Sequence, residues 1–351
     1  MEALLWIAGF FLLEIAGAFV WQAGIVAYDV GGRGNPAPAS PGALQALVES
    51  YLPSVMPWMV GTIKFAEVIA ALAAIRLRFG RRAFRVTGFR PVPAVHGLIL
   101  GLAVLPTAFL SGQSYALIRG YWDRLARHAP WLNDLDGFSS IEAVQEMAAS
   151  TPLLILVFVI AVLPALNEEF VFRAAIGRGL LGRYGLAAGI ALTSMLFAAV
   201  HLSPVHAAAL LPLAVLMHVG YLSSGSIWAP VGVHFLNNAL SVGLMKLATL
   251  APEVGGVATD VTESKFSPIL FVASAACVAA TVWLLMKVRV RWRLPDGREW
   301  RPERPGVEPP PPGLPASPIV PTPPVGPVAT AAVCYVLYPV AVVAGFLLQQ
   351  V

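Results

Sequence analysis

The sequence predicts an all-α, polytopic integral membrane protein, a bundle of about eight to nine transmembrane helices. Composition is the first observation: of 351 residues, 58% are hydrophobic and 12% are charged, and the mean hydropathy is +0.75. A soluble domain is typically about 45–50% apolar and about 25% charged. The chain therefore has too few charges to cover a water-facing surface, which argues against a soluble enzyme, a disordered protein or a nucleic-acid-binding protein.

Apolar windows long enough to cross a bilayer are the second observation. A helix needs roughly 20 apolar residues to cross a hydrocarbon core about 30 Å thick. The first window has no basic residues in front of it and contains Glu14, so we expect a spanning helix there rather than a signal peptide. In all, the sequence predicts about nine spans, at residues 3–28, 54–75, 92–118, 152–181, 186–203, 205–222, 228–250, 267–287 and 328–348.

Three connecting segments differ from the apolar windows in composition. Gly31–Gly42 is rich in glycine, proline and alanine, which predicts a loop. Arg119–Ser150 is polar and of mixed charge, and we expect a loop with a short surface helix. Pro295–Pro327 contains a run of prolines at Pro309–Pro312, which predicts an extended, polyproline-like linker.

Basic residues predict the orientation in the membrane. They cluster between the second and third spans, in Arg76–Arg90, and after the eighth, in Lys287–Arg304. With nine spans both clusters fall on one side, together with Arg183, and that side is expected to be cytoplasmic. The N-terminus is then cytoplasmic in a multi-pass protein of the cell membrane. The loop after the seventh span falls on the opposite side, and its acidic residues are Glu253, Asp260 and Glu263.

Ionisable residues inside a span are costly and usually mark function or a buried pair. The richest cluster is Asn167-Glu168-Glu169-Phe170-Val171-Phe172-Arg173. Glu169 and Arg173 are four residues apart on a predicted helix, so they share a face and are expected to form an ion pair. Glu168 points about 100° away and has no helical partner of opposite sign. Its expected role is chemical, with a structural carboxylate as the alternative.

Two further polar pairs interrupt apolar windows. His201 ends the fifth span after Phe197, which we expect to pack beside it, and His234 and Asn238 are four residues apart in the seventh. Glu168 and His201 could hold and activate a water molecule. His234 and Asn238 share a helical face and could stabilise an oxyanion. These residue types together are typical of a hydrolytic site.

Spacing supports a common depth for these residues. The turn Gly182–Gly185 lies about midway along the chain between Glu168 and His201, so antiparallel helices place them level, about 24 Å from the turn. His234 lies only about 13 Å from the turn before its own helix. All three meet only if the first hairpin projects about 10 Å further into the cytoplasm.

In order on successive hydrophobic helices, these motifs read Glu-Glu-x-x-x-Arg, Phe-x-x-x-His and His-x-x-x-Asn. This pattern resembles the CPBP (Abi) family, which includes type II CAAX prenyl endopeptidases and bacteriocin-processing or self-immunity proteins. Gly225-Ser226-Ile227-Trp228 resembles the family's approach to the third motif. The resemblance covers roughly residues 150–250.

The resemblance implies an intramembrane endopeptidase that acts on a membrane-associated protein or peptide in the bilayer. Glu168 would be the general base and His201 would help to position water. His234 and Asn238 would form the oxyanion site, supported by Glu169 and Arg173. We expect no required cofactor. Zinc held by Glu168, His201 and His234 is the alternative, although the sequence has no His-Glu-x-x-His motif.

We expect five parts in the chain: N-terminal transmembrane helices and loops (1–145), a CPBP-like catalytic membrane core (146–252), an additional transmembrane helix with a basic cytoplasmic end (253–294), the Pro-rich linker (295–327) and a C-terminal transmembrane helix (328–351).

Other functions remain open at this stage. Midplane charges also suit a transporter or channel, and a non-catalytic immunity or scaffold protein could retain the motifs. Gly-x-Gly-Asp and Gly-x-Ser-Gly, which mark aspartyl and rhomboid intramembrane proteases, do not occur. His206 and His218 are expected to be helix-contact residues, and Lys64 and Glu67 to neutralise each other. Glu14 could line an entry path or pair with Lys64.

Overall fold

The computed structural model describes residues 2–138, 141–250, 266–303 and 305–348. About 80% of the described residues are helical, and the prediction of an all-α membrane bundle is confirmed. Among the described residues, seven helical segments are long and apolar enough to cross a membrane. One of them, Leu153–Ala199, contains two of the predicted spans. The predicted acidic loop with Glu253, Asp260 and Glu263 lies outside the described residues.

The helix α10 (Trp228–Leu250) has the bounds predicted for the seventh span but is not among these seven segments. The reason lies in its composition, because His234, Asn237, Asn238 and Lys246 lower its mean hydropathy. These polar residues make α10 a helix that needs partners inside the bundle.

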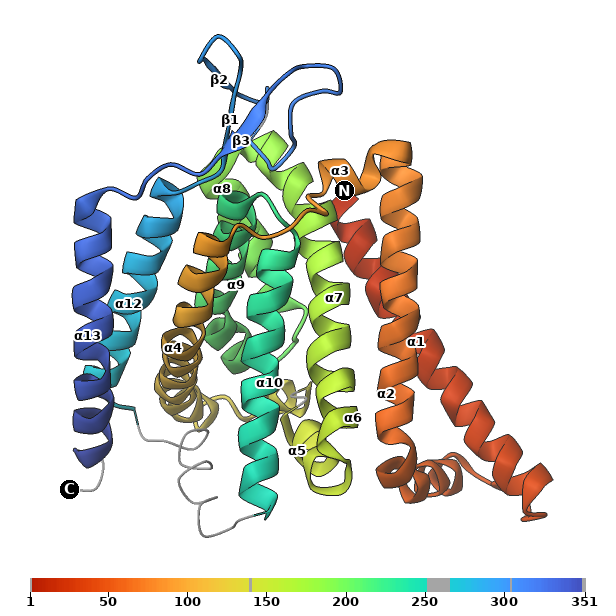
Figure 1. Ribbon diagram of the computed structural model, residues 1–351. Helices are drawn as coiled ribbons and strands as arrows, with labels where there is room; N and C mark the ends of the chain where they lie inside the picture. Colours follow the sequence, from red (N-terminus) through yellow and green to blue (C-terminus); the bar gives the residue numbers. More distant parts are fainter. Residues whose placement is uncertain (1, 139–140, 251–265, 304, 349–351) are drawn as a thin grey trace.

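The N-terminal part differs most from prediction in α2. This part consists of α1, the π-helical turn η1, α2, two short elements η2 and α3, then α4, η3 and α5. Figure 1 shows the first turns of α2 lying across the direction of the rest. Pro53 and Pro57 lie inside this helix and remove backbone hydrogen bonds where the predicted span begins. The bounds are α1 Glu2–Ala27, η1 Tyr28–Gly32, α2 Pro41–Phe79, η2 Gly80–Arg82, α3 Ala83–Val86, α4 Ala94–Ala126, η3 Pro130–Phe138 and α5 Ile141–Ser150.

The next helices contain the predicted site residues. α6 (Leu153–Val157), η4 (Phe158–Val162), α7 (Leu163–Glu169) and η5 (Phe170–Gly177) run continuously into α8 (Arg178–Ala199). Both η4 and η5 are π-helical, which the sequence did not predict. The chain reverses within α8 at Gly185, where φ is 81° and ψ is −176°. The turn predicted at Gly182–Gly185 is therefore present, and α9 (Pro204–Ser224) and α10 follow it.

The C-terminal part adds a small sheet that the sequence did not predict. After α12 (Pro268–Lys287), the strands β1 (Arg291–Arg293), β2 (Glu299–Trp300) and β3 (Ser317–Ile319) pair antiparallel in the order β2-β1-β3. The predicted linker 295–327 thus contains two short strands, β2 and β3, which both pair with β1. The last helix is α13 (Val325–Leu347).

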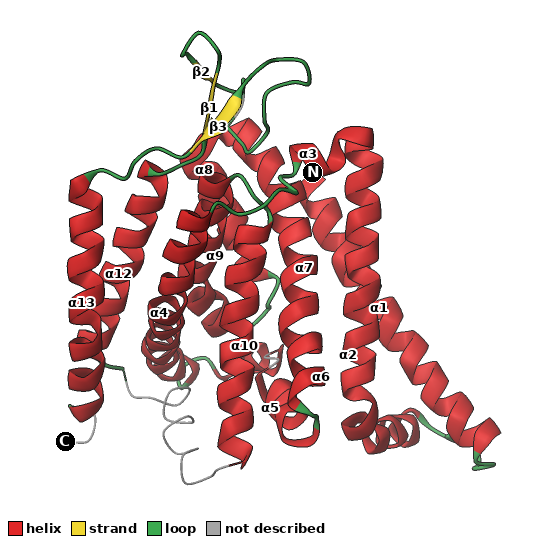
Figure 2. Cartoon of the chain, in the orientation of Figure 1, coloured by secondary structure: helices red, strands yellow, loops and turns green. Residues whose placement is uncertain are grey.

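The arrangement places the N-terminus and the sheet at one end of the bundle and the C-terminus at the other (Figures 1 and 2). The basic segments around α3 and after α12 lie at the end with the sheet (Figure 1), as the span count predicts. α4 packs against α9 and α12, and α8 against α9. The largest buried apolar cluster includes Phe172, Phe197, Leu216 and Tyr221, so η5 and α9 lie in the centre of the bundle.

Candidate active site

The predicted ion pair of Glu169 and Arg173 is present at the centre of the bundle. Arg173 Nη1 donates to Glu169 Oε1 at 2.7 Å, and both side chains are fully buried. Arg173 Nη2 also donates to the backbone carbonyl of Ala214 on α9 at 3.2 Å. The guanidinium carbon lies 4.4 Å from the centre of the Phe197 ring on α8. The pair therefore fixes η5 against both neighbouring helices.

The π-helical turn η5 begins directly after Glu169 and contains Arg173. π-Helical turns are rare and are frequently found at functional sites. A Cβ at Gly177, the last residue of η5, would lie 2.8 Å from Cε1 of His218. His218 is fully buried against this glycine, as expected for a helix-contact residue, but neither ring nitrogen has a hydrogen-bond partner among the described residues.

His234 lies between the two adjacent carboxylates. Its Nδ1 is 3.0 Å from Glu169 Oε1, and its Nε2 is 4.0 Å from Glu168 Oε2. An ionised carboxylate only accepts hydrogen bonds, so Nδ1 is assigned as the N–H donor to Glu169. Glu168 Oε2 is buried and has no hydrogen-bond partner among the described residues. Glu169 Oε2 is also buried without a partner among these residues, so the two carboxylates differ in the ion pair that Glu169 forms with Arg173. The ring thus lies between a carboxylate paired with arginine and one that is not.

Phe197 connects the two predicted histidines. Its ring centre is 5.4 Å from that of His201 and 5.7 Å from that of His234. Nδ1 of His201 lies 3.0 Å from the Phe197 carbonyl oxygen. Since a carbonyl oxygen only accepts, Nδ1 carries a proton and Nε2 is the free acceptor in the neutral ring. Phe197 packs beside His201, as predicted, and it also contacts the ring of His234.

His206 lies closer to the predicted site than the sequence suggested. Its ring centre is 5.3 Å from that of His201, in an edge-to-face contact. The chain ends α8 after Ala199 and begins α9 at Pro204, and Ser203 caps the new helix through the backbone N–H of His206. This short connection brings the rings of His201 and His206 into contact. The contact could not be predicted from helical spacing, because the two residues do not lie on one helix.

Asn238 is held by the other π-helical turn. Its Nδ2 donates to the carbonyl oxygen of Ile160 in η4 at 3.1 Å, and its Oδ1 is 3.4 Å from Nδ2 of Asn237. A π-helical turn interrupts the regular backbone hydrogen bonds, and Asn238 supplies a donor there. One amide hydrogen of Asn238 is therefore used by η4, and the second is not bonded to Ile160.

A polar network from α1 and α2 adjoins the carboxylates. Asn167, next to Glu168, donates from Nδ2 to Glu67 Oε2 at 2.6 Å. Glu67 Oε2 lies 3.1 Å from Lys64 Nζ, so the predicted neutralisation of this pair is present. Lys64 also forms an ion pair with Glu14, which resolves the alternatives left open for Glu14 in favour of pairing.

The zinc alternative was compared with the geometry. Across the described part of the chain, no group of three or more His, Cys, Asp and Glu side chains is arranged to hold a metal ion. Glu168, His201 and His234 therefore do not fit zinc in this arrangement.

Residues 150–240 match the family described as type II CAAX prenyl endopeptidase, Rce1-like. The match covers about a quarter of the chain and includes all three motifs. It confirms the resemblance to the CPBP/CAAX proteases. No curated protein and no solved structure matches the chain. At a coarse level, the Rce1-like match supports a peptidase in a multi-pass membrane protein with a membrane-associated substrate.

Proposed function

We propose that the protein is an intramembrane endopeptidase that hydrolyses a peptide bond of a membrane-associated protein or peptide, in CAAX-type or bacteriocin-type processing. The observation that carries the proposal is the position of His234 between Glu168 and Glu169 in a segment that matches the Rce1-like family. The predicted site residues Glu168, Glu169, Arg173 and His234 lie on α7, η5 and α10.

Glu168 is the proposed general base. Its free Oε2 accepts a proton from a water molecule while the water oxygen bonds to the scissile carbonyl carbon. The carbonyl π electrons move to the oxygen, which becomes an oxyanion. When this intermediate collapses, the C–N bond breaks and the proton passes from Glu168 to the leaving amine. The proposed role of His201 is to accept a hydrogen bond from the attacking water through Nε2.

His234 and Asn238 are the proposed oxyanion donors, and the geometry adds a condition for His234. Because Nδ1 donates to Glu169, Nε2 donates only when the ring carries both protons. Carboxylates stand on both sides of the ring. Glu169 and Arg173 act as positioning residues, because they orient His234 and do not reach the reacting atoms in this scheme. Asn238 contributes the amide hydrogen that Ile160 leaves unused.

The test is cleavage by the purified protein in a bilayer. Glu168→Gln keeps the shape of the side chain and removes the base, and loss of general-base catalysis typically costs about 10²–10⁴ in rate. Glu146→Gln is the matched control, because Glu146 is exposed on α5. Glu146→Gln should cleave as the wild type does. Full activity in Glu168→Gln, with unchanged unfolding, would contradict the assignment of the base.

The substrate is identified by comparing membrane protein termini in cells that carry the wild type or Glu168→Gln. New termini that disappear in the variant identify the cleaved bond and show whether the substrate is prenylated. Metal dependence is tested by exhaustive chelation followed by elemental analysis. We expect cleavage to persist without bound metal, and loss of cleavage restored by zinc would refute the metal-independent scheme.

Transport is the second candidate, and one observation favours it. Glu14, Lys64, Glu67 and Asn167 form a connected series of polar groups inside the bundle that ends beside Glu168. Such series carry protons in membrane transporters. A proton or solute flux into vesicles that Glu67→Gln abolishes, without any cleavage by the wild type, would favour transport. Neither cleavage nor flux would favour a scaffold or immunity protein.

A further inference from the structure

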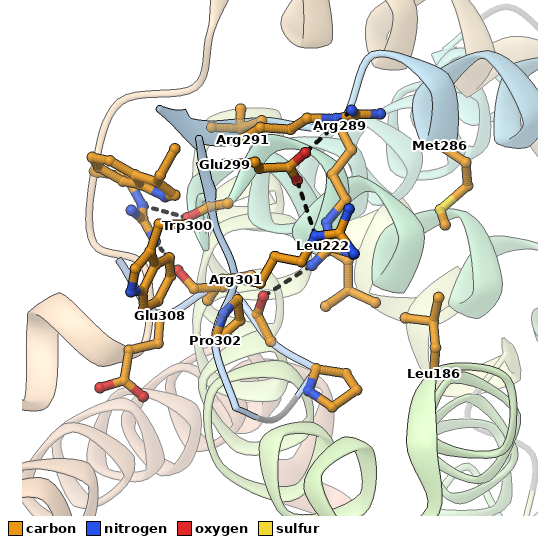
Figure 3. A pocket seen from close by; sticks show the side chains of 17 residues that line it. Leu186, Leu222, Met286, Arg289, Arg291, Glu299, Trp300, Arg301, Pro302 and Glu308 are labelled. Carbon is orange, nitrogen blue, oxygen red and sulfur yellow. Dashed lines mark hydrogen bonds and ion pairs between the residues drawn. The ribbon is translucent and has the colours of Figure 1, made fainter. Parts of the chain in front are cut away.

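A cavity of about 470 Å³ lies outside the candidate active site, at the end of the bundle that bears the small sheet. Its lining comes from α8, α9, α12, β1 and β2 and from the chain after β2 (Figure 3). No residue of the proposed catalytic set lines it. The cavity therefore needs a different explanation.

Its charged lining is dominated by arginine: Arg90, Arg289, Arg291 and Arg301 face only Glu299 and Glu308. Both carboxylates are already paired. Glu299 lies 3.4 Å from Arg291 and 3.9 Å from Arg301, and Glu308 lies 3.5 Å from Arg178. Figure 3 shows Glu299 between its neighbouring arginines.

Arg90 and Arg289 have no carboxylate partner among the described residues. Arg90 Nε donates to the carbonyl of Gly225 at 2.5 Å, and Arg289 Nη2 to the carbonyl of Gly306 at 3.1 Å. Burial is the main cause that lowers the pKa of both guanidinium groups. For Arg289, the carboxylate of Glu299 acts in the opposite direction and Arg291 adds a smaller lowering. Arg90 Nη2 also donates to the carbonyl of Val307, and the guanidinium carbon lies 5.7 Å from the centre of the Trp292 ring. A half-buried guanidinium whose hydrogen bonds go to neutral carbonyls keeps further N–H donors for an anion, and phosphate suits their planar fork.

The remaining wall is apolar and lies at the level where the spans end. Leu222 is in the last turn of α9, Met286 is in the last turn of α12, and Leu186 follows the reversal at Gly185. Trp292 and Trp300, paired across the strands, also line the cavity. Tryptophan is enriched at the membrane–water interface. A ligand here meets cations and hydrocarbon at the depth of the lipid headgroups.

We propose that this cavity binds the headgroup of an anionic phospholipid. Its phosphate lies against Arg90 and Arg289, with Arg291 and Arg301 at the rim, and the first part of an acyl chain follows Leu186, Leu222 and Met286. A soluble phosphate would leave the apolar wall without a partner, and a zwitterionic lipid would bring its own cation to the arginines. The proposal does not depend on the proposed peptidase activity.

The test is lipid binding by the full-length protein in detergent. Dioleoyl phosphatidylglycerol, dioleoyl phosphatidylcholine and inorganic phosphate are titrated separately, with retention measured by native mass spectrometry and unfolding temperature. We expect phosphatidylglycerol to bind more tightly than phosphatidylcholine and to raise the unfolding temperature. Arg289→Gln should weaken phosphatidylglycerol about fivefold, the equivalent of about 1 kcal/mol for one basic residue near an anionic lipid.

Arg293→Gln is the matched control, because Arg293 is exposed on the same strand β1 as Arg291 but does not line the cavity. It should bind phosphatidylglycerol as the wild type does. Arg301→Gln, which removes an exposed charge at the rim, repeats the test should Arg289→Gln unfold, and it should weaken binding. Equal binding of both lipids, equal weakening by Arg293→Gln, or inorganic phosphate reproducing the whole effect would each overturn the proposal.

Discussion

The buried pair of Glu169 and Arg173 gives the sharpest test of how this site is held together. Methionine is unbranched like arginine but carries no charge. Arg173→Met therefore leaves Glu169 buried without its cation. At 2.7 Å and an effective dielectric constant near 20, the lost attraction is about 6 kcal/mol. Part of this is offset because the pair was costly to desolvate. Removing one partner of a buried pair typically destabilises by about 3–5 kcal/mol, and we expect Arg173→Met in that range.

The double variant separates this charge effect from packing. Replacing a buried pair by apolar residues of similar volume is often neutral or stabilising by about 1–4 kcal/mol. We therefore expect Glu169→Leu with Arg173→Met to be more stable than Arg173→Met alone. We expect the double variant to be inactive in cleavage, because Nδ1 of His234 loses its acceptor Glu169. The assay is reversible unfolding in mixed micelles, alongside peptide cleavage.

One result would refute this reasoning. If the destabilisation of the double variant equalled the sum of the two single variants, the two side chains would be energetically independent. The contact of 2.7 Å would then contribute nothing, and the loss in Arg173→Met would come from packing against Phe197.

Two further predictions use matched pairs of neighbouring residues. Asn238→Ala should lower the rate constant of single-turnover cleavage by about 10²–10³, the usual cost of losing an oxyanion donor. Asn237→Ala should lower this rate constant less. The reverse order would place the donor at Asn237. Gly177→Ala should destabilise by about 1–3 kcal/mol in reversible unfolding, because its Cβ would lie 2.8 Å from His218. Gly179→Ala, with open space around its Cβ, should not destabilise, and equal losses would refute the packing argument.

The parts of the fold that follow from local sequence were predicted well. The apolar window 228–250 coincides with α10, and the spacing of Glu169 and Arg173 predicted their ion pair. Such features depend on residues within one helix, whose periodicity is visible in the sequence. The start of α2 was wrong, because a polar, proline-containing segment before residue 54 still forms helix at the end of the bundle.

Features that depend on contacts between distant segments were not predicted. The strand β3 pairs with β1 across a proline-rich stretch, and no composition rule marks Ser317–Ile319 as a strand. The contact between His201 and His206 depends on the short connection between α8 and α9. The π-helical turns η4 and η5 also have no local signature, although Asn238 reaches one of them. The proposed roles of the site residues stay predictions until cleavage is measured.

Two adjacent carboxylates in one helix acquire different environments here, and this difference carries the proposed chemistry. Glu169 faces Arg173 and His234, so its charge is matched and one of its oxygens is engaged by both partners. Among the described residues, each of the two carboxylates keeps one buried oxygen without a hydrogen-bond partner. Glu168 differs because no hydrogen bond joins it to Arg173, and its Oε2 lies 4.0 Å from Nε2 of the same imidazole. Environment assigns the roles of paired carboxylates, one to structure and one to proton transfer. Exchanging the two roles by substitution would require moving Arg173 as well, because its position four residues after Glu169 selects which carboxylate is neutralised.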